Sequence, residues 1–176
     1  MRIESDVVET GAEFSRDRLY RYRLWRRWAD GPCLMVVGLN PSTADALNDD
    51  PTVRRCIGYA RRWGFGGLRM LNLFALRSTD PKGLYQAADP LGPRNVAAIR
   101  REARTTIAAD GAVLAAWGNH GQLGDHAQRI RVVLERTGVG AACLGLTKVG
   151  EPKHPLYLRA DATPTPLLGD GGRLCR

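Results

Sequence analysis

The chain lacks the usual features of membrane, secreted and metal-binding proteins. No apolar run approaches the length of a membrane span, and residues 1–10 are polar and acidic, without a signal-peptide pattern. The four cysteines are scattered, with neither metal-ligand spacing nor the arrangement of a disulfide framework. We therefore expect a cytoplasmic protein without a membrane segment, and we expect neither a cofactor nor a metal.

Lysine is also scarce, although the chain is basic. The formal net charge is +8, and the only lysines are Lys82, Lys148 and Lys153, so arginine supplies most of the positive charge. A basic domain suits a polyanionic partner, most often nucleic acid. An arginine-rich composition alone would give the same net charge. The positions of the arginines must therefore decide between these interpretations.

The chain has 176 residues, of which 44% are hydrophobic, which suits one globular domain with a substantial core. We place the domain at residues 14–160 and expect residues 1–13 and 161–176 to be loosely ordered. Inside the domain, apolar runs alternate with segments of helical periodicity, and Asp50 and Asp125 are expected to cap helices. The apolar runs lie at residues 33–38, 68–76, 112–117 and 141–146. This alternation predicts an α/β fold, a three-layer αβα sandwich with a central, mainly parallel sheet of about four strands.

Residues 14–28 are dense in arginine and aromatic residues. Tyr20, Tyr22 and Leu24 alternate with arginines, which predicts a further strand that ends near Leu24 and buries one face. Arginine interleaved with tyrosine is also typical of a nucleic-acid surface. The other interpretation is an edge strand that arginine keeps soluble.

A polar loop follows the first apolar run. Gly38 allows the chain to turn and a ligand to approach, and Pro41 stiffens the loop. Ligands of open α/β sheets bind outside the carboxyl ends of the strands, so we expect a site here, although such residues also satisfy their own backbone in turns. The hydrogen-bonding side chains of the loop belong to Asn40, Ser42, Thr43 and Asp45.

The later strands also end in polar residues, which we expect at the same edge of the sheet. These residues are Asn72, Asn119 with His120, and His154 between two prolines. The carboxylates of Asp45, Asp49 and Asp50 could hold magnesium, but we interpret them as capping and turn residues. Four arginines fall away from the buried stripe of the helix that begins after Asp50, where they could contact phosphates. They are Arg54, Arg55, Arg61 and Arg62.

Five stretches together resemble a bacterial family of unknown function, domain of unknown function 1643, over residues 14–158. They are Gly38–Asp45, Asp50–Thr52, Asn72–Ala75, Trp117–Asn119 and His154–Leu158. More remotely, four of them resemble the uracil-DNA glycosylase superfamily, one of them because Asn72 lies where a strand-end asparagine reads the base in some branches. Gly38-Leu39-Asn40-Pro41 is similar to its first motif, His154-Pro155 to the start of its second, and Trp117-Gly118 to the end of its third strand.

The second resemblance implies a uracil-DNA glycosylase-like fold and hydrolysis of the N-glycosidic bond of a modified or mismatched base in nucleic acid. On this resemblance Asn40 positions a water, His154 donates a hydrogen bond to the leaving base and Asn72 reads its edge. Phe74 or Trp117 stacks on the base, although both also suit a core.

The sequence also departs from the superfamily. Ser42 stands in place of a glycine, and Leu156 in place of a serine. Two alternatives therefore stay open: a non-catalytic module that binds nucleic acid or a nucleotide, and a hydrolase of free nucleosides or nucleotides.

Overall fold

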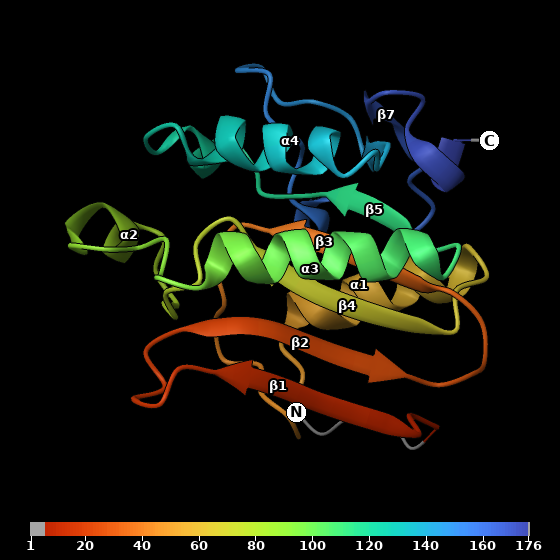
Figure 1. The fold of residues 1–176 in the computed structure, drawn as a ribbon, viewed down its shortest axis with the longest axis horizontal. Coiled ribbons are helices and arrows are strands. Elements are labelled where there is room, and N and C mark those ends of the chain that lie inside the picture. Colours follow the sequence, from red (N-terminus) through yellow and green to blue (C-terminus); the bar gives the residue numbers. More distant parts are fainter. Residues whose placement is uncertain (1–5, 176) are drawn as a thin grey trace.

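One sheet of seven strands organises the computed structural model, which describes residues 6–175 (Figure 1). The strands lie side by side in the order β1-β2-β4-β3-β5-β6-β7. They are β1 (Glu9–Phe14), β2 (Arg21–Arg27), β3 (Cys33–Gly38), β4 (Gly67–Asn72), β5 (Ala112–Ala115), β6 (Ala141–Cys143) and β7 (Thr165–Leu168).

The prediction of an α/β fold is confirmed, but the predicted sheet of about four mainly parallel strands is wrong. Three pairs are parallel, β3–β4, β3–β5 and β5–β6, and three are antiparallel, β1–β2, β2–β4 and β6–β7. Continuous apolar runs are typical of strands that are buried on both faces. The additional strands β1, β2 and β7 contain polar or charged residues, so this signal does not detect their full extent.

Helices cover both faces of the sheet. Residues of α1 pack into one buried apolar cluster, and residues of α3 and α4 into another, so α1 lies behind the sheet in Figure 1 and α3 in front of it. No helix within residues 6–175 is long and apolar enough to cross a membrane. The helices are α1 (Pro51–Arg62), α2 (Lys82–Gln86), α3 (Asn95–Ala108) and α4 (His126–Arg136), with short 3₁₀ turns at η1 (Asn119–Gln122), η2 (Pro155–Tyr157) and η3 (Gly172–Cys175).

Of the two predicted helix caps, the structure contains one, at Asp50, and lacks the other, at Asp125. The Asp50 carboxylate accepts a hydrogen bond from the Val53 amide at 2.8 Å, and Pro51 takes the first helical position, so this cap is confirmed. Asp125 occupies the cap position of α4 but makes no side-chain cap hydrogen bond. The prediction that its side chain caps that helix is therefore wrong.

Both terminal segments that the sequence suggests are loosely ordered contribute strands to the sheet. β1 pairs with β2 from Glu9 opposite Arg27 to Phe14 opposite Arg21, and β7 pairs with β6. Residues 1–5 and 176 of those segments lie outside the described residues. Because β1 and β4 flank β2, β2 is an interior strand that continues to Arg27, and its interpretation as an edge strand ending near Leu24 is wrong.

Candidate functional site

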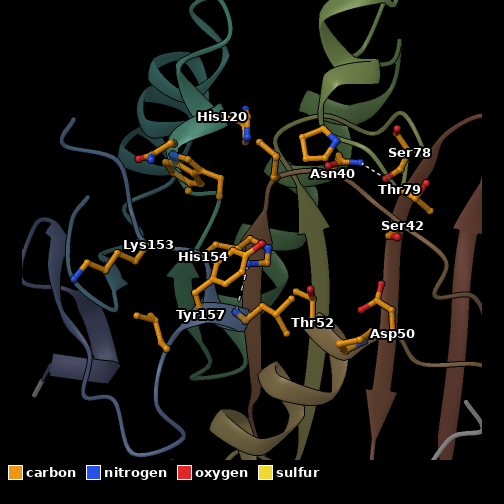
Figure 2. A pocket seen from close by; sticks show the side chains of 18 of the residues that line it. Asn40, Ser42, Asp50, Thr52, Ser78, Thr79, His120, Lys153, His154 and Tyr157 are labelled. Carbon is orange, nitrogen blue, oxygen red and sulfur yellow. Dashed lines mark hydrogen bonds between the residues drawn. The ribbon is translucent and has the colours of Figure 1, made fainter. Parts of the chain in front are cut away.

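A cavity of about 720 Å³ lies beyond the carboxyl ends of β3 and β5 (Figure 2). β3 pairs with β4 on one side and with β5 on the other, and α1 and α3 leave the sheet on opposite faces. This is the topological switch point at which open α/β sheets bind ligands. The predicted site residues that line it are Asn40, Ser42, Thr43, Trp117, Asn119 and His154.

The Asn40 side chain is oriented by the backbone around it. Its amide nitrogen donates to the carbonyl oxygen of Ser78 at 2.8 Å (Figure 2). It also donates to the carbonyl oxygen of Pro41 at 3.0 Å. Both amide protons are therefore used, and no described residue donates to the side-chain oxygen. An amide oxygen held in this way can accept a hydrogen bond from a water or a ligand in the cavity.

His154 reaches the cavity because its segment passes close to the end of β5. The Gly118 amide donates to the Pro152 carbonyl at 2.7 Å, and Gly118 has a φ of 71°. A Cβ added at Gly118 would lie 3.3 Å from the His154 Cβ, so a side chain there would crowd the histidine. Glycine thus provides both the backbone conformation and the space for this approach.

The environment of His154 favours a neutral ring with its proton on Nε2. The Leu156 amide donates to Nδ1 at 3.4 Å, so Nδ1 is the acceptor nitrogen. Burial lowers the pKa of His154 below its ordinary value of 6.5, and the nearby charge of Asp50 opposes this effect. Nε2–H therefore remains a hydrogen-bond donor at neutral pH.

We expect His154 to titrate below pH 6.5, which an NMR titration of the imidazole, assigned with a His154→Gln variant, would measure. Since the unfolded chain binds this proton more readily, His154 should lower the free energy of unfolding as the pH falls below about 6.5 and contribute nothing above it. Wild-type protein should therefore lose more stability than His154→Gln on acidification. An identical pH dependence of unfolding in both proteins would contradict this expectation.

Asp50 lies at the site, although its sequence pattern favours a helix cap over the alternative of a magnesium ligand. Its side chain lines the cavity opposite His154, yet only 7% of the residue is exposed (Figure 2). One carboxylate oxygen accepts from the Val53 amide, which leaves the other available to the cavity. The capping pattern explained Asp50 fully, so only its place after a strand-end loop could have indicated a second role.

A smaller recess of about 40 Å³, called the inner recess, adjoins the cavity. Asn40, Asp50 and His154 line both spaces, whereas Arg21, Gly38 and Asn72 line the recess only. The predicted residues Gly38 and Asn72 therefore lie deeper than the other site residues. A Cβ added at Gly38 would come within 2.9 Å of the side-chain nitrogen of Asn72, so a side chain at position 38 would displace the Asn72 amide.

Apart from the four arginines of α1, three predicted site residues do not line the cavity or the inner recess. Pro41 is buried, and its carbonyl accepts from Asn40 and from the Ser78 amide. The Asp45 carboxylate accepts hydrogen bonds from the backbone amides of Leu47 and Asn48, as in a turn. Phe74 is fully buried in the core. These three residues therefore lie outside both spaces, and the position of Phe74 agrees with its alternative interpretation as a core residue.

Trp117 combines both of its predicted roles. It is 1% exposed and belongs to the core, but it also lines the cavity. Its indole nitrogen donates to Glu151 at 2.6 Å, and the same carboxylate pairs with Arg131 at 3.0 Å. These contacts hold the ring in place as a rigid wall at the end of β5.

Three of the four arginines predicted to contact phosphates line a second cavity of about 470 Å³ along α1. They are Arg54, Arg55 and Arg62. This second cavity shares Pro51 and Leu156 with the large cavity, so the two adjoin. Arg61 is directed elsewhere, because it pairs with Asp6 at 2.8 Å and stacks over the Trp28 ring at 4.6 Å.

Two buried arginines of β2 hold the loop that carries Asn40 and Asp50. Arg21 donates to the Ala44 carbonyl at 2.9 Å, and Arg26 donates to the Asp45 carbonyl at 2.6 Å. Arg26 also pairs with Asp49 at 2.8 Å. Only 2% of Arg21 and 1% of Arg26 is exposed, so neither belongs to a nucleic-acid surface. Burial lowers the pKa of Arg21 to about 10.

The three neighbouring aspartates form no metal site. Within residues 6–175, no group of three or more histidine, cysteine, aspartate or glutamate side chains could hold a metal ion. Asp45 completes a turn, Asp49 pairs with Arg26 and Asp50 caps α1. Each carboxylate is therefore accounted for by a different contact.

Comparison with known proteins gives one match. A family model described as "Protein of unknown function (DUF1643)" matches residues 21–156. No curated protein and no solved structure matches the chain.

Proposed function

The chain belongs to the DUF1643 family, whose function is unknown, and we propose from its site that it hydrolyses the N-glycosidic bond of a modified or mismatched base in nucleic acid. One observation carries the proposal: Asn40, Asp50 and His154 line a single cavity at the switch point of the sheet. The order of the motifs, which resembles the uracil-DNA glycosylase superfamily, supports it and leads us to propose a fold of that kind.

The cavity offers the groups that this reaction needs. The Asn40 oxygen and the free oxygen of Asp50 can both accept hydrogen bonds from a water, and Asp50 can take its proton. The water oxygen bonds to C1′ of the sugar while the bond between C1′ and the base nitrogen breaks, through an oxocarbenium-like state. The bonding electron pair leaves with the base, which finally receives the proton.

His154 would stabilise the leaving base. Its Nε2–H can donate to an acceptor on the base where negative charge develops, and such preorganised donors are effective because they need not reorient. Its lowered pKa keeps the ring neutral, so Nδ1 continues to accept from Leu156 and fixes the donor on Nε2. Asn72 would read the edge of the base from the inner recess, and Trp117 would form a wall beside it.

Incubation with labelled oligonucleotides, each with one altered base, tests the proposal. We expect an alkali-sensitive site to form at one altered base, and we expect the Asn40→Ala protein to lose this activity. Uracil, hypoxanthine, xanthine and methylated or hydroxymethylated pyrimidines are suitable substrates, in single and double strands. Binding without cleavage of any strand would instead support the non-catalytic module. Release of a base from free nucleosides, but not from oligonucleotides, would support the nucleoside hydrolase.

A further inference from the structure

We propose that the arginine groove, defined by Arg54, Arg55, Arg62, Pro51 and Leu156, binds a single strand of nucleic acid and directs one of its bases into the cavity. This inference rests on the proposed function, since it names the form of nucleic acid that the site accepts. Three features of the groove carry it: its position, its charge and an exposed aromatic ring at its end.

The groove leads to the mouth of the cavity. It runs between α1 and residues 156–160, and the Tyr59 hydroxyl ties the two together by donating to the Arg159 carbonyl at 2.6 Å. Arg54 and Arg62 are eight positions apart on α1, which corresponds to roughly 12 Å along the helix. Since Pro51 and Leu156 line both spaces, a chain of phosphates in the groove would continue to the mouth of the cavity.

The charge of the groove remains positive after its neighbours are counted. Arg54 donates to the Asp49 carbonyl at 2.9 Å, which orients the guanidinium. The Asp49 carboxylate is also near Arg54, but it already pairs with Arg26 at 2.8 Å. Asp161 lies near Arg62, and it pairs with Arg159 at 2.9 Å. Arg55 and Arg62 form no ion pair with a described residue. Arginine is well suited to contacts with phosphate oxygens, because its planar group donates in pairs.

An exposed ring at the junction favours a single strand over a duplex. Tyr157 is 84% exposed, follows Leu156 directly and lies 5.6 Å from the His154 ring between centroids (Figure 2). An aromatic ring can stack on an unpaired base of any identity. A base of a single strand also enters a pocket more readily, because no base pair has to open.

Equilibrium binding tests the groove without any turnover. We would titrate a fluorescent oligodeoxythymidine of about 12 nucleotides, and a duplex of the same length, over a series of salt concentrations. We expect tighter binding of the single strand. Log affinity should fall linearly with the logarithm of the salt concentration. Replacing Arg54, Arg55 and Arg62 with glutamine should reduce the magnitude of this slope by about 2, which is about 0.7 for each lost phosphate contact.

A matched triple variant controls for net charge. Arg100, Arg104 and Arg129 are exposed on α3 and α4, so their replacement by glutamine changes the charge equally but should preserve the salt slope. A variant with lysine at positions 54, 55 and 62 keeps the positive charge and should preserve most of the slope. The comparison shows whether the glutamine variant binds weakly because it lacks the charge or because it is misfolded. Tyr157→Ala should weaken single-strand binding by about 5- to 150-fold.

Two results would overturn the groove assignment. The first is an equal decrease of the salt slope in the two triple glutamine variants, and the second is tighter binding of the duplex than of the single strand. These outcomes are distinct from failure of the proposed function. The binding assay uses undamaged thymidine strands, so a protein that cleaves no base can still confirm the groove. Conversely, if the protein releases a base but its salt slope is unchanged by replacement of the groove arginines, only the proposal that the groove binds the strand is disproved.

Discussion

Replacing Asp50 with asparagine is expected to lower the rate of base release by about 10²- to 10⁴-fold, the usual contribution of a general base. Asparagine has nearly the same shape and is also a good helix cap, so α1 should still begin at Pro51. The amide cannot take a proton from the attacking water. Single-turnover measurements on the oligonucleotide that the wild-type protein cleaves would give the rate, and binding of the same strand should be almost unchanged.

A second aspartate provides the control. Asp110 is exposed, lies at the far end of the sheet and has a φ of 54°, a conformation that asparagine also accepts. Asp110→Asn therefore changes the net charge equally without approaching the cavity, and its rate should match the wild type. If Asp50→Asn retained full activity, Asp50 would be only a cap, and the Asn40 oxygen alone would position the water.

The parts of the fold that the sequence predicts well are those whose signals are local. β3 is an unbroken apolar run, and α1 has an apolar stripe that follows a capping aspartate and a proline. A loop of hydrogen-bonding residues follows β3 directly. Such features depend only on neighbouring residues, so they predict that Asn40 lies at the carboxyl end of β3 before any contact is known.

The burial of the arginines of β2 depends on residues that are distant in the sequence. Its arginines alternate with apolar residues, as they would on a solvated strand, but Arg21 and Arg26 are buried. Burial of a guanidinium requires partners, and these partners are backbone carbonyls and a carboxylate in the loop at residues 44–50, some twenty positions away. No pattern within residues 14–28 could reveal that pairing.

Asp50 shows a different limit of sequence interpretation. Its capping pattern is complete, and the only other role that the sequence suggests for it, as a magnesium ligand, does not concern a reaction with water. Its second role follows from the position of α1, whose first turn begins at the rim of the cavity. The cap that starts the helix therefore also places a carboxylate opposite His154.

Replacing Arg26 with methionine is expected to lower the free energy of unfolding by about 3–5 kcal/mol, the typical cost of breaking a buried ion pair. The change leaves Asp49 buried without its partner, and burial already raises the pKa of that carboxyl. It also removes the donors to the carbonyls of Asp45 and Asn48, so the site loop should loosen. Chemical denaturation would measure the loss.

Arg27→Met is the matched control, because Arg27 is half-buried and its carboxylate contact, with Glu9, is long at 3.9 Å. It should cost about 1 kcal/mol or less, as exposed ion pairs do. A second change, Asp49→Leu, should restore part of the stability that Arg26→Met loses, since it removes the unpaired carboxylate. The restored double variant should still release bases slowly, because an apolar pair cannot hold the loop carbonyls that orient Asn40 and Asp50. Recovery of both stability and activity would show that Arg26 serves only to neutralise Asp49.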